Sequence, residues 1–145
     1  MRSPKAAARE YVLDANAVIR QFAGDEAGGS LKVQELIRQT QMGSTHLFMS
    51  VINLGEVYYT LLKTAGESTA ATYIGTLRNF VYMVPADADQ ALEAAGLKHR
   101  YKLGYADSYA AALAIGRKAT LVSADPAFEK LGTHLKWMRL PGHRP

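Results

Sequence analysis

The sequence contains no cysteine among its 145 residues. Disulfide bonds, thiolate zinc sites and cysteine nucleophiles are therefore excluded, and a reducing cytoplasm is the expected location. The chain also lacks any apolar run that approaches the ~20 residues of a membrane-spanning helix, so we expect no membrane contact. Residues 1–9 carry Arg2, Lys5 and Arg9 without an apolar stretch, which does not fit a signal peptide.

Composition and charge are otherwise ordinary. Hydrophobic residues make up 48% of the chain, charged residues 21%, and the formal net charge is +4. We expect one domain over residues 1–145, with 1–9 as a loose lead-in and 24–30 as a flexible polar stretch. The small positive charge is compatible with an anionic partner such as nucleic acid, although many other proteins share it.

Short apolar segments that favour β-strands alternate with helical patterns along the chain. The strand candidates are 11–14, 46–51, 80–84, 120–123 and 135–140, and the helix candidates are about 31–43, 53–66, 68–77, 87–97 and 106–116. Ser68 and Asp87 are predicted N-caps, and Gly43, Gly66 and Gly116 are predicted helix ends. The alternation predicts an α/β fold, in which a central parallel sheet is flanked by helices on both faces.

Acidic residues stand at several junctions between these elements. Asp14 and Asp125 follow predicted strands, Asp107 stands at the start of a helix, and Glu56 lies one turn into another helix. In open α/β sheets, ligands bind beyond the carboxyl ends of the strands. A parallel sheet could therefore gather these acids on one edge.

Each acid also has a purely structural interpretation. Asp125 precedes Pro126 and fits an N-cap, and Asp107 fits the first turn of a helix, where the dipole favours an acid. Glu56 lies opposite the apolar stripe of its helix, which is typical of a solvated position. Asp14 is harder to explain in this way, because it interrupts an apolar segment where an unpaired carboxylate is costly to bury.

Taken together, the acids favour a metal site. Clustered carboxylates repel one another, and a hard divalent cation with oxygen ligands removes that penalty. We therefore predict Mg²⁺ or Mn²⁺ as the cofactor. Zinc is not favoured, because the histidines are scattered and are interpreted as surface or structural residues. They are His46, His99, His134 and His143.

At these residues the chain resembles the PIN-domain nuclease family, and within it the VapC-type toxins of toxin–antitoxin pairs. The motifs that carry the resemblance are Tyr11–Ile19 (YVLDANAVI), Ser50–Val57 (SVINLGEV), Leu103–Ala114 (LGYADSYAAALA) and Leu121–Phe128 (LVSADPAF). Each motif is short, but their order and spacing extend from Tyr11 to about Leu140. The resemblance implies a PIN fold in which Asp14, Glu56, Asp107 and Asp125 are the acidic catalytic and metal-binding positions. It also implies that Asn16 and Ser123 support the site.

The resemblance further implies hydrolysis of RNA with Mg²⁺ or Mn²⁺. Asp14 and Asp107 are the expected direct metal ligands, whereas Glu56 and Asp125 would bind directly, bind through water or help to activate the nucleophile. An antitoxin protein and a second copy of the chain are the expected protein partners. The apolar pairs Tyr58–Tyr59 and Leu61–Leu62 are candidates for a contact surface, with core packing as the alternative.

Basic residues near the acids are expected to offset the repulsion between an acidic site and an RNA backbone. The candidates form two groups on either side of the 106–116 helix, namely Lys98, Arg100 and Lys102 before it and Arg117 and Lys118 at its end. If they contact phosphates, RNA affinity should fall steeply with salt. The alternative is that they are ordinary solvated helix ends.

Two other functions fit the sequence less well than a nuclease does. A phosphatase with an aspartyl nucleophile would need a second acid two residues after Asp14, and Asn16 cannot act as one. A catalytically silent PIN-like module that binds RNA or protein would be indicated by loss of the acids, and all of them are present.

Overall fold

A central parallel β-sheet organises the chain. The computed structural model describes residues 7–24 and 29–141. The strands are β1 (Arg9–Leu13), β2 (Thr45–Ser50), β3 (Val81–Val84), β4 (Thr120–Ser123) and β5 (Trp137–Arg139). All neighbouring strands are parallel, in the order β3-β2-β1-β4-β5. The predicted parallel sheet is confirmed, with β1 at its centre.

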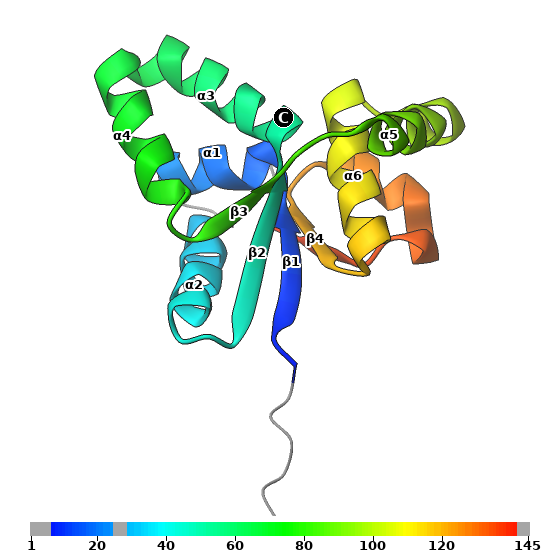
Figure 1. The fold of residues 1–145 in the computed structure, drawn as a ribbon, viewed down its shortest axis with the longest axis horizontal. Coiled ribbons are helices and arrows are strands. Elements are labelled where there is room, and N and C mark those ends of the chain that lie inside the picture. Colours follow the sequence, from blue (N-terminus) through cyan, green and yellow to red (C-terminus); the bar gives the residue numbers. More distant parts are fainter. Residues whose placement is uncertain (1–6, 25–28, 142–145) are drawn as a thin grey trace, which may run out of the picture.

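Helices cover both faces of this sheet (Figure 1). On one side lie α1 (Ala15–Ala23), α2 (Gly29–Gln41), α3 (Val51–Ala65) and α4 (Glu67–Leu77); on the other lie α5 (Ala88–Tyr101), α6 (Tyr105–Arg117) and the 3₁₀ segment η1 (Pro126–His134). Successive residues of β1 alternate between the two faces, as a strand requires. Tyr11 and Leu13 belong to the core beneath α1–α4, and Val12 belongs to the core beneath α6 and η1.

The first helix was not anticipated by the apolar pattern. α1 starts directly after Asp14, whose side chain accepts a hydrogen bond from Ala17 N at 2.8 Å. It ends at Gly24, which has φ +65°. Three consecutive apolar residues, 17–19, show no helical period in so short a segment, so the cap rather than the pattern identifies this helix.

Several predicted helix ends are also wrong by one to four residues, and the largest error is at α5, which continues to Tyr101 instead of ending near residue 97. Ser68 lies inside α4, which begins at Glu67. α6 runs through Gly116 and stops only where Lys118 adopts a left-handed conformation with φ 54°. By contrast, Asp87 caps α5 as predicted, because its side chain accepts from Gln90 N at 2.8 Å.

The polar segment between α1 and α2 is only partly described. Residues 25–28 lie outside the described residues, but Gly29 and Ser30 are already helical, which corrects part of the prediction of a flexible stretch over 24–30. Of the predicted lead-in, Arg9 belongs to β1 and residues 1–6 lie outside the described part. No helix within the described ranges combines the length and apolarity that crossing a membrane requires.

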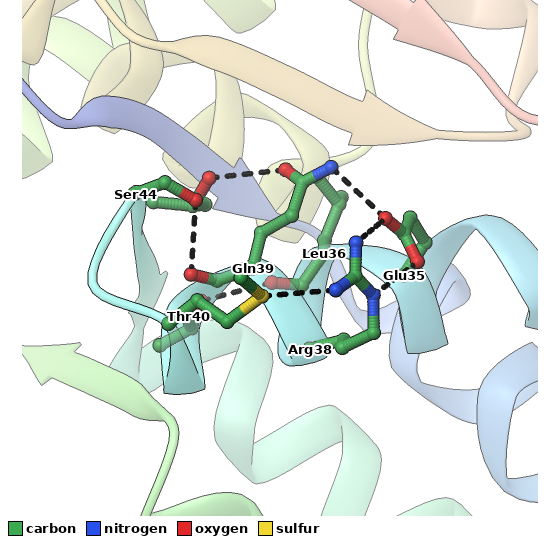
Figure 2. A network of polar contacts seen from close by, with 8 residues as sticks. Glu35, Leu36, Arg38, Gln39, Thr40 and Ser44 are labelled. Atoms are coloured by element: carbon green, nitrogen blue, oxygen red, sulfur yellow. Dashed lines mark hydrogen bonds and ion pairs between the residues drawn. The ribbon is translucent and has the colours of Figure 1, made fainter.

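A network of polar contacts fixes the connection from α2 into β2 (Figure 2). Gln39 lies at its centre: its side chain donates to Glu35 Oε1 at 3.3 Å and accepts from Thr45 Oγ1 at 3.1 Å, and its carbonyl accepts from Ser44 Oγ at 3.1 Å. Hydrogen bonds from Arg38 to Glu35 lower the pKa of that carboxyl to about 2. This network lies at the amino end of β2. The acidic residues lie beyond the opposite, carboxyl edge of the sheet.

Candidate active site

The carboxyl ends of β1 and β4 lie side by side, and this pairing brings Asp14 next to the Ser123–Asp125 segment. Leu13 pairs with Val122 in the sheet, and Asp14 N donates to Val122 O at 3.3 Å. Ser123 is the last residue of β4, and Asp125 follows as the N-cap of η1. The sheet register therefore decides which acids become neighbours.

Asp14 is a buried carboxylate at the centre of this edge. Its side chain is part of a residue only 1% exposed, and it accepts from Ala17 N and from the Ser123 hydroxyl. Its pKa is raised from the ordinary 3.8 to about 7, chiefly by burial. The two hydrogen bonds lower the pKa, and the charges of Asp107 and Asp125 raise it. Burial outweighs the hydrogen bonds, so ionised Asp14 lacks full compensation.

Asp107 lies in the first turn of α6 and faces the same group of acids. Its pKa is raised from 3.8 to about 7 by burial, by the charge of Asp125 and a hydrogen bond to its side chain, and by the charge of Glu56. Asp125 therefore acts on the Asp107 carboxyl group both by its charge and by a hydrogen bond. Through these interactions Asp14, Asp107, Asp125 and Glu56 form one electrostatically linked group, which we call the acid cluster.

The carboxylates of the acid cluster do not converge on one metal-sized site. Among the residues that the structure describes, no three carboxylate or imidazole side chains lie close enough together to hold one ion. The chemistry of the donor set still fits Mg²⁺ or Mn²⁺, which take oxygen ligands and tolerate bridging waters.

Asp125 is the N-cap of η1, as its structural interpretation predicts, and it also belongs to the acid cluster. Its Oδ1 accepts from Ala127 N at 2.9 Å, and Pro126 occupies the first position of η1. The same carboxylate raises the pKa of Asp107. Capping therefore fixes the orientation of a side chain that also acts on its acidic neighbours.

Asn16 and Ser123, the predicted supporting residues, connect the segments that carry the acids. Ser123 Oγ donates to Asp14 and accepts from Asp125 N, the latter at 3.0 Å. Asn16 Oδ1 accepts from Ala124 N at 3.2 Å, which ties α1 to the β4–η1 connection. These contacts hold Asp14 and Asp125 in a fixed relation.

Asn53 is a positioning residue that the sequence analysis missed. It is fully buried, and its Nδ2 donates to Glu56 Oε1 at 3.2 Å and to Ala106 O at 3.0 Å. Both partners accept, so the amide nitrogen must face them. Since Ala106 precedes Asp107, this one side chain sets the exposed Glu56 against the turn that carries Asp107.

A sequence signal for Asn53 exists. It stands four residues before Val57 and eight before Leu61, both fully buried, so it is a polar residue on the apolar stripe of α3. Gly104 is a second residue that supports the acid cluster. A Cβ there would lie 3.3 Å from Asp107 Oδ2, so the close approach of backbone and carboxylate favours glycine.

The predicted basic residues separate into two groups in space. Lys98, Arg100 and Lys102 lie at the end of α5, just before α6 begins, and all are exposed. Arg117 lies at the other end of α6. It pairs with Glu10 at 2.7 Å and stacks on the Phe48 ring at 3.7 Å. Of the histidines, His46, His99 and His134 are exposed as predicted, and His143 lies outside the described residues.

The chain belongs to the PIN domain family, whose model matches residues 11–133. No curated protein sequence gives a significant match. Among solved structures, the fold is similar to VapBC2 from Rickettsia felis bound to a promoter DNA fragment (TM-score 0.71, 17% identity, covering 90% of this chain and 98% of that one). It is also similar to DNA-bound VapBC from Salmonella typhimurium (TM-score 0.70, 16% identity, covering 91% of this chain and 98% of that one). A third similar structure is Mycobacterium tuberculosis VapC20, described as a sarcin–ricin loop cleaving toxin (TM-score 0.67, 19% identity, covering 93% of this chain and 99% of that one).

The raised pKa of Asp14 predicts an unusual dependence of stability on pH. Between about pH 4 and 7 the folded protein holds a proton on Asp14 that the unfolded chain releases, so the free energy of unfolding falls as pH rises. Asp14→Asn should therefore stabilise the metal-free protein at pH 8 by about 1–4 kcal/mol and have a much smaller effect at pH 5. Urea unfolding in chelator measures both values. Glu93→Gln, at an exposed position on α5, is the control, and an Asp14→Asn protein no more stable than wild type at pH 8 contradicts the prediction.

The contacts of Asn53 predict a loss of stability on truncation. Asn53→Ala removes the hydrogen bonds that this buried amide donates to Glu56 Oε1 and Ala106 O, and we expect it to lower the free energy of unfolding by about 1–3 kcal/mol. Glu56→Gln keeps an acceptor for Asn53 and should change stability by less than about 0.5 kcal/mol. Equal effects in urea unfolding would show that Asn53 does not hold the two helices.

Proposed function

We propose that this protein is a Mg²⁺- or Mn²⁺-dependent endoribonuclease and the toxin of a VapBC-type toxin–antitoxin pair. The observation that carries the proposal is the acid cluster beyond the carboxyl edge of the sheet, in which Asp14 and Asp107 both have a pKa near 7. Carboxylates that are buried and also raise one another's pKa, in a PIN domain, favour a bound cation over a purely structural role.

The residues that would hold the cation are Asp14 and Asp107, with Asp125 and Glu56 binding directly or through water. When bound, such a cation lowers the pKa of water and offsets the charge on a phosphodiester. Asp14 is already oriented by Ser123 and by Ala17 N–H, so little freedom is lost on binding. A cation bound beside Asp107 would offset the charges of Asp125 and Glu56 that raise its pKa.

Glu56 is suited to a proton-transfer role. It is exposed, and Asn53 engages only Oε1, which leaves Oε2 to accept a proton from an attacking water. Asn53 would keep this carboxylate directed at the Asp107 turn during the reaction. The alternative of a catalytically silent binding module is less well supported, because each acid is retained and electrostatically linked to its neighbours.

The toxin assignment is supported by the PIN family and by the similarity of fold to proteins solved as VapBC complexes. We propose an antitoxin partner that covers the acid cluster, and RNA as the substrate, by analogy with the cleavage activity ascribed to VapC20. The net charge of +4 is compatible with an RNA substrate.

Self-association through α3 is part of the same proposal. Tyr58, Tyr59 and Leu62 are 36%, 62% and 36% exposed, and they lie on one side of the helix. Leu61 is fully buried and belongs to the core, so it is removed from the predicted contact pairs. Tyr59→Lys should shift a dimer toward monomer in sedimentation velocity, whereas an unchanged assembly state would rule out this surface.

The nuclease proposal predicts cleavage of RNA that depends on both metal and acids. With Mg²⁺ or Mn²⁺, wild-type protein should cleave a mixed RNA substrate, and chelator should abolish cleavage. Asp14→Asn and Asp107→Asn should each lower the rate by about 100-fold or more, because each removes a ligand charge. Glu93→Gln is the matched loss of an exposed acid and should cleave normally.

Two results would overturn the nuclease proposal. Cleavage that persists in chelator or in Asp14→Asn would exclude the metal mechanism. A wild-type protein that neither cleaves RNA nor binds Mn²⁺ in calorimetry would favour the silent binding module. A growth defect on expression, relieved by a small neighbouring reading frame, tests the toxin role separately.

A further inference from the structure

A basic hollow lies where α5 ends and α6 begins. Its volume is about 500 Å³, and its lining residues are Ala95, Lys98, His99, Lys102 and Tyr105. Two of the lining side chains are lysines, one is a histidine, and none is acidic. The charge of this lining fits an anionic ligand. We call this feature the α5–α6 hollow.

Tyr105 gives the hollow an exposed aromatic ring that is held in place. The residue is 51% exposed, and its ring meets the ring of Tyr109 edge to face at 5.2 Å between centroids. The two hydroxyl groups lie 3.4 Å apart, and Tyr109 is only 7% exposed. An exposed ring supported by a buried one is a suitable surface for stacking a base.

Lys102 occupies a backbone conformation that its side chain does not favour. It ends α5 with φ 55° and ψ 46°, and its N–H donates to Lys98 O at 2.8 Å. Glycine is the usual residue at such a left-handed helix end, because a Cβ is disfavoured there. The charge of a lysine is favourable at a helix C-terminus, and here it also adds to the positive lining of the hollow.

We propose that the α5–α6 hollow binds a nucleotide of single-stranded RNA that flanks the cleaved bond, with Tyr105 stacking on the base and Lys102 and His99 contacting phosphate. Lys98 contributes charge and supports the connection, since its Nζ donates to Leu103 O at 3.0 Å. This inference rests on the proposed ribonuclease function and adds a place for the substrate.

The position of the hollow relative to the acid cluster supports this assignment. Tyr105 and Asp107 belong to the same first turn of α6, two residues apart, so they point to different sides of the helix. An RNA strand that passes over the N-terminal turn of α6 would contact both Tyr105 and the acid cluster. The base bound by Tyr105 would therefore belong to a flanking nucleotide, and Tyr105 would influence sequence context rather than the chemical step.

Lys118, which the sequence also offers as a phosphate contact, lies at the other end of the same helix and provides a matched comparison. It ends α6 with φ 54° and ψ 35°, nearly the conformation of Lys102. It precedes Ala119 and the amino end of β4, whereas the acids lie beyond the carboxyl ends of the strands. Replacing either lysine by glycine removes one charge and relieves the same backbone conformation.

The test measures binding of a fluorescent single-stranded RNA by anisotropy, with each variant built on Asp14→Asn to prevent cleavage. Lys102→Gly should weaken binding about five-fold or more and reduce the slope of log affinity against log salt by about 1. Lys118→Gly should change affinity less than two-fold. Both should melt at or above the temperature of the parent, which excludes unfolding as the cause.

Tyr105 is tested in the same assay. Tyr105→Ala should weaken binding about five-fold or more, because one stacked base is lost, and Tyr105→Phe should bind like the parent. Equal losses in Lys102→Gly and Lys118→Gly, or none in either, would overturn the subsite even if the wild-type protein cleaves RNA. A selective loss in Lys102→Gly would support the subsite even if cleavage were absent, and absence of RNA binding altogether would overturn both proposals.

Discussion

The buried carboxylate of Asp14 is the constraint on which the rest of the site depends. It ends β1, caps α1 through Ala17 N and accepts from Ser123 at the end of β4. One side chain therefore links the central strand, the first helix and a neighbouring strand. Its high pKa shows that these contacts do not fully compensate for burial, so the fold retains an acidic group that is unfavourable when ionised.

The features that could be predicted from the sequence are those that local rules determine. Asp14 interrupts an apolar strand, Asp125 precedes a proline and Asp87 fits an N-cap, and the structure places each at the expected junction. The parallel sheet follows from the alternation of strands and helices, because that alternation has few other solutions. The order of the strands, which makes β4 the neighbour of β1, is not determined by any local pattern.

The remaining features depend on contacts between distant segments. Asn53 is visible in the sequence as a polar residue on an apolar stripe, but its partner is known only once α6 brings Ala106, 53 residues away, to its side chain. The two basic groups flank the same stretch of sequence, but they lie at opposite ends of α6. Arg117 therefore pairs with Glu10 near the amino end of β1, whereas Lys102 lies beside Tyr105. Spacing along the chain could not separate them, because the length of one helix lies between the groups.

Asp107 shows which electrostatic effect dominates at the site. A helix N-terminus favours a carboxylate by about 0.3–1 kcal/mol, which lowers a pKa by less than about one. The pKa of Asp107 is nevertheless raised to about 7, so burial and the adjacent Asp125 outweigh the helix. An acid that only stabilised the helix N-terminus would have a lowered pKa. The direction of the pKa shift thus distinguishes an acid that only stabilises a helix N-terminus from one that belongs to an acid cluster. For Asp107 the pKa is raised, as expected for a member of the acid cluster.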